Sequence, residues 1–153
     1  MTELVIRAAE QADLPALQDL YRHLLPEDER CPDDRAAAIL DKLRHFEGSA
    51  ILIGLLGTEL VASCTVIVIP NLTRGGMPYA LIENVVTDAG RRGQGLGKAI
   101  LKAALDRAWE AGCYKTMLMT GSRNPATLGF YAAAGFEQSK TGFQARRLPA
   151  RTE

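Results

Sequence analysis

The chain has 153 residues, of which 47% are hydrophobic and 24% charged, and its 18 basic residues are balanced by 18 acidic ones. This length and composition predict one globular domain over residues 1–153, large enough to fold without disulfides or a metal. Zero net charge disfavours a nucleic-acid partner held on a basic face of the protein.

The cysteines and the apolar runs predict a cytoplasmic protein without a metal. Cys31, Cys64 and Cys113 lie far apart, and together with only two histidines they form no metal-binding spacing. They are most simply interpreted as reduced thiols packed in a cytoplasmic protein. The stretch MTELVIRAAEQADLP lacks the apolar core of a signal peptide, and no apolar run approaches the roughly 18 residues of a membrane helix. We therefore expect no membrane association.

Hydrophobic periodicity and turn signals predict alternating helices and strands along the chain. Asp13 is a candidate N-cap for the first helix, Asn124 opens the last helix, and Gly135 closes it. In the central helix, the expected buried stripe includes Trp109 at its end. The expected elements, in chain order, are a strand over 4–7, helices over 14–24 and 34–46, strands over 51–56, 60–69 and 79–87, a helix over 96–111, a strand over 116–119, a helix over 125–134, and a last pair of strands at 136 and 143–148. This order predicts a mixed α+β sheet rather than the strict alternation of a doubly wound fold.

The stretch RRGQGLGKAI, residues 91–100, places three glycines immediately before and within the first turn of the central helix. A glycine inside a helix costs about 1 kcal/mol relative to alanine, so Gly93, Gly95 and Gly97 favour a loop and a helix start. There, the absent Cβ allows a ligand to approach the backbone, and the free N–H groups of the first turn suit a phosphate.

The charges around these glycines also favour a bound anion. A helix start normally attracts acidic residues, but here Arg91, Arg92 and Lys98 all precede the first acid, Asp106. The alternative is a flexible glycine turn whose charges are solvated. The phosphate-loop pattern GxxxxGK[ST] fails because residue 99 is alanine, and the dinucleotide pattern GxGxxG fails because its third glycine would fall on Lys98.

The pattern RxxGxG, present as RGQGLG over residues 92–97, resembles the acetyl-CoA pyrophosphate loop of the GNAT acetyltransferase superfamily. The helix KAILKAALDRAWEAG, the later NPATLGFYAAAGF and the opening IRAAEQADLPALQDLY are also similar to the family's elements, so the resemblance covers nearly the whole chain. The departures, Thr87, Ala89 and Thr127, lie outside the phosphate loop. The resemblance implies an α+β GNAT fold with a mixed, mostly antiparallel central sheet, helices on both faces, and splayed strands that form the acetyl-CoA cleft.

The resemblance also implies which residues bind acetyl-CoA. The amides of the loop would bind the pyrophosphate, and the backbone of the preceding strand would pair with the pantetheine arm as an added strand. A strand N–H near Val85 or Val86 would polarise the thioester carbonyl, while the side chains of both valines belong to the core. Helix capping alone is an equal explanation for Asn124. The expected set is Val85, Val86, Thr87, Arg92, Gly93, Gln94, Gly95, Leu96, Gly97, Lys98 and Asn124.

Two side chains are candidates for the chemistry. Tyr131, in FYAAAGF, matches the family tyrosine that lies near the CoA sulfur and protonates the leaving thiolate; the alternative is a structural tyrosine. Glu83 lies between apolar residues in LIENVV, and strand alternation places it on the face of Leu81 and Val85. A poorly solvated carboxylate suits a general base, although a structural hydrogen bond would explain it as well.

The acceptor pocket has no recognisable motif in this sequence. The family builds that pocket from the first two helices and the C-terminal strands, which is where its members vary. Asn84 and Tyr79 are weaker candidates for the pocket, whereas His23 and His45 are expected at the solvated surface.

The function implied by the resemblance is an acetyl-CoA-dependent N-acetyltransferase that transfers the acetyl group directly to a primary amine of a small molecule in a ternary complex. The stretch LIENVVTD resembles the corresponding strand of glucosamine-phosphate N-acetyltransferases, which favours amino sugars among other amines. Two alternatives stay open: a protein or peptide N-acetyltransferase, and a module that senses acyl-CoA without turnover. Cys64 or Cys113 as a covalent nucleophile is the weaker mechanism. A homodimer is expected from the family alone.

Overall fold

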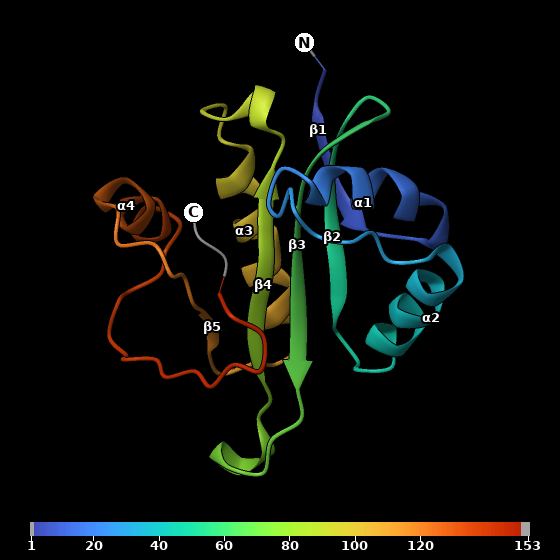
Figure 1. Cartoon of the computed structure of the whole chain (residues 1–153). Helices are drawn as coiled ribbons and strands as arrows, with labels where there is room; N and C mark the ends of the chain where they lie inside the picture. Colours follow the sequence, from blue (N-terminus) through green and yellow to red (C-terminus); the bar gives the residue numbers. More distant parts are fainter. Residues whose placement is uncertain (1, 151–153) are drawn as a thin grey trace. The chain divides into compact units, whose positions relative to one another are not determined.

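The computed structural model, which describes residues 2–150, contains one sheet of five strands that neighbour each other in sequence order. The strands are β1 (Leu4–Ala8), β2 (Ala50–Leu56), β3 (Glu59–Ile69), β4 (Tyr79–Thr87) and β5 (Thr116–Leu118). The first four pair antiparallel, and β5 pairs parallel to β4 (Figure 1). The predicted mixed, mostly antiparallel sheet is therefore confirmed.

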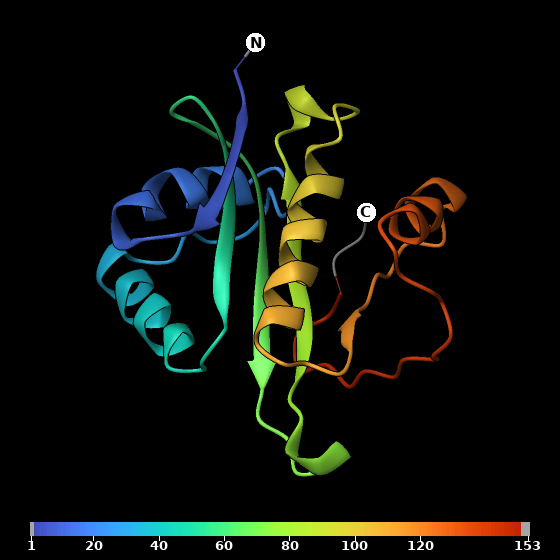
Figure 2. The same cartoon turned by 180° about the vertical axis from the view of Figure 1, so that it is seen from behind.

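Helices cover both faces of this sheet. The α-helices of the described chain are α1 (Leu14–Tyr21), α2 (Asp33–Arg44), α3 (Leu96–Glu110) and α4 (Pro125–Ala133), and the 3-10 turns are η1 (Gln11–Asp13), η2 (Arg74–Gly76) and η3 (Ala89–Arg91). α1 packs against β3 and β4 on one face, and α3 packs against β2, β3 and β4 on the other (Figures 1 and 2). α2 lies beside α1 and contacts β2.

The apolar stripes of α1 and α3 form much of the core. Leu14, Leu17 and Leu20 of α1 are buried, and Leu101 of α3 is completely buried. Each fully buried leucine contributes about 1.5–3 kcal/mol to the free energy of folding. Trp109, predicted as part of the α3 stripe, is instead 49% exposed. The helical rotation carries residue 109 beyond the flank of the stripe, so its ring leaves the core.

A bulge interrupts the pairing of β4 with β3. Thr65 faces Glu83, but Ser63 faces Val86, so β4 holds one extra residue between these two pairs. Asn84 lies in this interval with φ of 52°, a left-handed conformation that asparagine tolerates better than most residues. The strand therefore changes direction directly before the segment that was predicted to bind pantetheine.

The second half of β4 has a partner on one side only. β5 pairs with β4 over Ala80, Ile82 and the residue between them, and then ends at Leu118. Within the described chain, residues 83–87 pair with β3 alone. Since backbone groups alternate between the two sides of a strand, some N–H and C=O groups of this half of β4 face its open side.

The expected last pair of strands, at 136 and 143–148, is wrong. In the part of the chain that the structure describes, no strand follows Leu118. Phe143 and Leu148 are 91% and 76% exposed, so neither side chain is buried as in a strand that covers a core. A strand needs a neighbour to satisfy its backbone groups, and the pattern of a short segment does not supply that neighbour.

Asp13 precedes α1 as predicted, but its side chain does not cap that helix. Its carboxylate accepts two hydrogen bonds from the Arg7 guanidinium, at 2.7 and 2.9 Å, and one from the backbone N–H of Glu10, at 2.8 Å. The turn η1 stands directly before α1, so Asp13 completes a capping box for this turn and ties it to β1.

The chain divides after Leu118 into two compact units, and the second contains α4. The side-chain oxygen Oδ1 of Asn124 accepts a hydrogen bond from the N–H of Ala126 at 3.0 Å, which caps the start of α4. Gly135 follows the end of the helix with φ of 99°, where glycine is favoured. Both predicted ends of this helix are confirmed.

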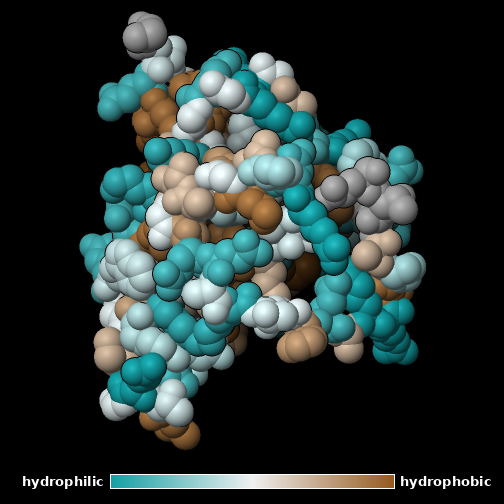
Figure 3. All heavy atoms as spheres, turned by 90° about the vertical axis from the view of Figure 1, so that its left-hand side faces the viewer, coloured by the Kyte–Doolittle hydropathy of each residue, from teal (hydrophilic) through white to brown (hydrophobic). Residues whose placement is uncertain are grey.

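Apolar side chains are scattered over the surface. On the face drawn in Figure 3, hydrophobic residues interrupt the hydrophilic ones at several separate places. Leu72, in the connection between β3 and β4, is 97% exposed. Within residues 2–150, no helix combines the length and the apolar composition that a bilayer crossing requires.

Candidate active site

The loop that was predicted to bind the pyrophosphate, residues 92–97, follows β4 and the turn η3 and leads into α3. The N–H of Asp88 donates to the carbonyl of Val61 at 2.8 Å, and its Oδ1 accepts from the N–H of Gly90, also at 2.8 Å. Gly93 and Gly95 follow with φ of 80° and 78°. These angles lie in the left-handed region, which explains why glycine occupies both positions.

The start of α3 offers unpaired backbone donors. Its N-cap is Gly95, which has no side chain to cap the helix, and the first turn holds no acidic residue. The helical ladder begins where Ala99 donates to the carbonyl of Gly95 at 3.1 Å, so the N–H groups of residues 96–98 precede it. Leu96 is 6% exposed and fixes this end of the loop in the core. Such a helix start fits the pyrophosphate of acetyl-CoA.

The two arginines before the glycines have different environments. Both carboxylate oxygens of Glu59, at the start of β3, contact the guanidinium of Arg91. Arg92 is exposed, and so is Lys98 on α3. Arg91 therefore ties the loop to β3 through Glu59, whereas the charges of Arg92 and Lys98 remain available to interact with an anion.

The predicted pantetheine strand runs through the bulge. Val86 is 4% exposed, which agrees with a core role for its side chain, and Val85 and Thr87 are half-buried. Glu83 is exposed, contrary to the expectation that its apolar neighbours would shield it. The register shift falls between the pair Thr65–Glu83 and the pair Ser63–Val86. The alternation of side chains that was used to place Glu83 on the same face as Val85 therefore does not continue across it.

A hydroxyl cluster that the sequence did not indicate lies beside the bulge. Tyr21, the last residue of α1, is half-buried; burial raises its pKa, and hydrogen bonds with the side chains of Thr65 and Ser63 oppose that shift. Those two β3 residues pair with Glu83 and Val86. No local pattern could have identified Tyr21, because its partners lie more than forty residues away.

His23 was expected at the solvated surface, and it is exposed, but it also has a partner in the turn η3, which leads into the glycine loop. The backbone N–H of Ala89, the first residue of η3, donates to Nδ1 of His23 at 2.8 Å. The side-chain hydrogen bond of His45 is local, between its Nδ1 and the carbonyl of Asp41 at 2.7 Å. The two histidines, equivalent in the sequence analysis, therefore differ in the structure.

Tyr131 and Asn124 belong to the second compact unit. Tyr131 is half-buried, with its ring centroid 5.1 Å from that of Phe130 and 6.5 Å from that of Phe136, both in edge contacts. Burial raises the pKa of the Tyr131 hydroxyl. A tyrosine hydroxyl keeps its proton at neutral pH with or without this shift, so the shift alone does not distinguish a proton donor from a structural tyrosine. The side chain of Asn124 caps α4, which supports the capping explanation for this residue.

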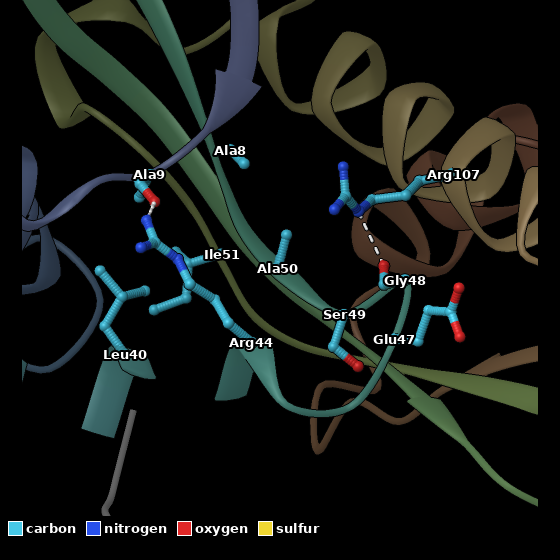
Figure 4. Close-up of a pocket in the computed structure, with 10 residues that line it drawn as sticks. All are labelled: Ala8, Ala9, Leu40, Arg44, Glu47, Gly48, Ser49, Ala50, Ile51 and Arg107. Atoms are coloured by element: carbon cyan, nitrogen blue, oxygen red, sulfur yellow. Dashed lines mark hydrogen bonds between the residues drawn. The ribbon is translucent and has the colours of Figure 1, made fainter. Parts of the chain in front are cut away.

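A separate pocket of about 330 Å³ contains none of the predicted site residues. Arg44, at the end of α2, and Arg107, on α3, reach toward it from two sides (Figure 4). Arg44 donates to the carbonyl of Ala9 at 2.6 Å, and Arg107 donates to that of Gly48 at 2.7 Å. Positive charge near the C-terminus of a helix is favourable in itself. The two hydrogen bonds also hold in place the connections that contain Ala9 and Gly48, beside the pocket.

Within residues 2–150, no group of three or more histidine, cysteine or acidic side chains is arranged to hold a metal ion.

The similarities to known proteins agree with this geometry. The chain matches the model of the acetyltransferase (GNAT) family over residues 14–136. It is 31% identical over 138 residues to glucosamine 6-phosphate N-acetyltransferase from Trypanosoma brucei brucei, covering 89% of this chain and 90% of that protein.

Solved structures share the fold. A candidate acetyltransferase from Agrobacterium tumefaciens str. C58 is 43% identical with a TM-score of 0.87, over 94% of this chain and 99% of that one. An aminoglycoside N-acetyltransferase solved in complex with CoA is 19% identical with a TM-score of 0.77, over 97% of each chain. The chain therefore belongs to the acetyltransferase (GNAT) family and is an acyltransferase of that family.

Proposed function

We propose that the protein is an acetyl-CoA-dependent N-acetyltransferase that transfers the acetyl group directly to a primary amine of a small molecule in a ternary complex. The observation that carries the proposal is the uncapped start of α3, which follows a loop of left-handed glycines and the half-open strand β4. The first feature suits a pyrophosphate, and the second suits an amide-containing arm that pairs like a strand.

The binding residues in this proposal are those that the resemblance implies. The amides of residues 93–98 bind the pyrophosphate, and Arg92 and Lys98 add positive charge beside it. The backbone of Val85, Val86 and Thr87 pairs with the pantetheine arm. A backbone N–H near Val85 or Val86 donates to the thioester oxygen and stabilises the charge that develops there.

The chemical step moves one acetyl group and two protons. The amine nitrogen attacks the carbonyl carbon and loses a proton to Glu83, directly or through a bound water. The carbon–sulfur bond then breaks, and Tyr131 donates its proton to the thiolate of CoA; exchange with solvent then removes the proton from Glu83 and returns one to Tyr131. The exposure of Glu83 favours the route through water, because the carboxylate remains in contact with solvent.

The cysteines disfavour a covalent acetyl-enzyme. Cys64 is completely buried, and burial raises its pKa to about 12, so it remains a thiol rather than a nucleophilic thiolate. Cys113 is 7% exposed, and burial raises its pKa as well. Direct transfer requires neither residue.

Amino sugars and amino-sugar phosphates are the first acceptors to test. The relative from Trypanosoma brucei brucei is named for glucosamine 6-phosphate, and a relative from Oryza sativa, 33% identical over 125 residues, is named as a probable enzyme of the same kind. A protein acceptor and a sensing role without turnover remain the alternatives.

We further propose that residues 1–153 form one functional domain, that the protein is cytoplasmic, and that it forms a homodimer. Light scattering tests the proposed homodimer.

The deciding experiment measures CoA release from acetyl-CoA with a panel of amines: amino sugars and their phosphates, amino acids, polyamines and aminoglycosides. Glucose 6-phosphate, which lacks an amine, is the matched control for glucosamine 6-phosphate. Turnover that requires the amine supports the proposal. Tight binding of acetyl-CoA in calorimetry without any turnover favours a protein acceptor or a sensing role, and the absence of binding contradicts the proposal.

A further inference from the structure

One hydrogen bond joins the connection after α1 to the turn η3 before the phosphate loop, between residues 66 positions apart. His23 stands two residues after the end of α1, and Ala89 begins the turn η3 that leads into the loop. Their contact, from the N–H of Ala89 to Nδ1 of His23, measures 2.8 Å.

The direction of this bond defines the state of the histidine ring. A backbone N–H can only donate, so Nδ1 must provide a lone pair, and the ring is neutral with its hydrogen on Nε2. An imidazolium carries a hydrogen on both nitrogens and could not accept a bond from Ala89.

The same turn is fixed at two further points, both on β3. The N–H of Asp88 donates to the carbonyl of Val61 at 2.8 Å, and Arg91 pairs with Glu59. Both partners belong to the sheet, whereas His23 comes from the helical layer. Anchors from two different elements define the position of η3 better than anchors from one.

The residues after η3 depend on such anchors. Arg92 is exposed, and a Cβ built on Gly93 or Gly95 would meet no atom within 4 Å, so no packing holds this stretch. At its far end, Leu96 is buried. A flexible stretch loses less entropy on binding a ligand when both of its ends are already fixed.

We propose that His23 is a positioning residue of the acetyl-CoA site, which holds the near end of the phosphate loop through Ala89. The inference rests on the proposed function, because it takes acetyl-CoA as the ligand of the loop. His23 acts through the backbone and does not itself touch the co-substrate.

The test compares three variants. His23→Leu removes the acceptor, whereas His23→Asn keeps one, because its amide oxygen can occupy about the place of Nδ1. We expect His23→Leu to raise KM for acetyl-CoA about two- to tenfold at nearly unchanged kcat, the effect of losing one hydrogen bond. His23→Asn should restore most of the affinity. His45→Leu, the matched control, should leave KM unchanged, since the hydrogen bond of its ring is a local one to the carbonyl of Asp41.

Amide exchange at Ala89, followed by NMR, tests the bond itself. We expect slower exchange in the wild type and in His23→Asn than in His23→Leu. If wild-type protein binds acetyl-CoA but His23→Leu has the same KM, the inference is wrong and the proposed function stands. Equal loss in His23→Leu and His23→Asn also overturns it, because the hydrogen bond then does not matter. If the wild type binds no acetyl-CoA in calorimetry, both proposals fall.

Discussion

At the scale of single residues, two glycines at the ends of α3 have nearly the same backbone and different surroundings in the sequence. Gly95 precedes the helix with φ of 78°, and Gly112 follows it with φ of 85°. A Cβ at either position would meet no atom within 4 Å. An alanine at either position therefore introduces the same backbone strain without a clash, and the pair separates the role of the loop from the cost of the strain.

Gly95→Ala should weaken acetyl-CoA binding, and Gly112→Ala should not. Both variants should lower the free energy of unfolding by about 1–2 kcal/mol, because an L-residue is strained in the left-handed region. Calorimetry with acetyl-CoA and urea denaturation measure the two effects. Equal affinity in the two variants would mean that the phosphate does not bind at the start of α3.

Tyr131→Phe tests the proposed proton donor. The substitution keeps the aromatic contacts with Phe130 and Phe136 and removes the hydroxyl whose pKa is raised by burial. We expect kcat to fall about 100-fold or more, while the Kd of acetyl-CoA stays near the wild-type value. Tyr114→Phe, in a ring contact with Tyr79, is the control and should keep wild-type kcat. Unchanged kcat in Tyr131→Phe would remove this residue from the mechanism.

Some features of the candidate site leave no trace in the sequence. The glycine loop was predictable because its left-handed backbone conformation is a local property, and the sequence shows a glycine at each position that adopts it. The contact of His23 with Ala89, and of Arg91 with Glu59, depend on which elements meet in space. The exposure of Glu83 depends on a bulge, and the bulge exists only in relation to the partner strand.

At the scale of elements, α1, α2, α3 and the first four strands were predictable from periodicity, because each turns inward a face that its own sequence marks, whereas α4 buries no residue and was predictable from its two ends. β4 was predicted over the residues that it occupies, and α4 between its cap and its closing glycine. The prediction of strands at 136 and 143–148 was wrong because strand pairing depends on two segments, not on one. The prediction that Trp109 is buried was wrong because extending the apolar stripe by one residue crosses to the exposed side of α3.

The ion pair between Arg7 and Asp13 ties β1 to the turn before α1. The Arg7 guanidinium, through its hydrogen bonds, holds the pKa of Asp13 below its usual range. A carboxyl with a lowered pKa in the folded state contributes stability above its unfolded pKa, about 4, and loses that contribution as pH falls through the folded value.

Asp13→Asn should therefore lower the free energy of unfolding by about 1 kcal/mol at neutral pH, and the difference from wild type should shrink below about pH 4. Denaturant unfolding at several pH values measures this. Asp19→Asn is the control, because the Asp19 side chain is 69% exposed in its pair with Arg30 and should contribute little. A deficit of Asp13→Asn that is constant with pH would show that the charge of Asp13 is not the cause.

At the scale of the whole molecule, the three cysteines are buried to different degrees, so the reactivity of each thiol measures how far the folded structure must open to expose it. Cys31 is half-buried, Cys113 is 7% exposed, and Cys64 is completely buried with a pKa raised to about 12. Cys64 lies on β3, the strand that pairs with both β2 and β4, so a reagent reaches it only when the sheet opens.

A disulfide reagent at about pH 8 should therefore modify Cys31 first, and Cys64 only under conditions that unfold the protein. The time course of thiol release, with peptide mapping of the modified sites, measures the order. Cys64→Ala should remove the slowest phase and leave the fastest unchanged. Rapid modification of Cys64 in the folded protein would contradict the burial of β3.

The exposure of Trp109 has a consequence for spectroscopy. It is the chain's single tryptophan, and the residue is 49% exposed near the end of α3. An indole in contact with water already emits at long wavelength, so unfolding can shift its fluorescence only slightly. Because the indole is accessible, its fluorescence should instead change when a molecule binds near that end of α3.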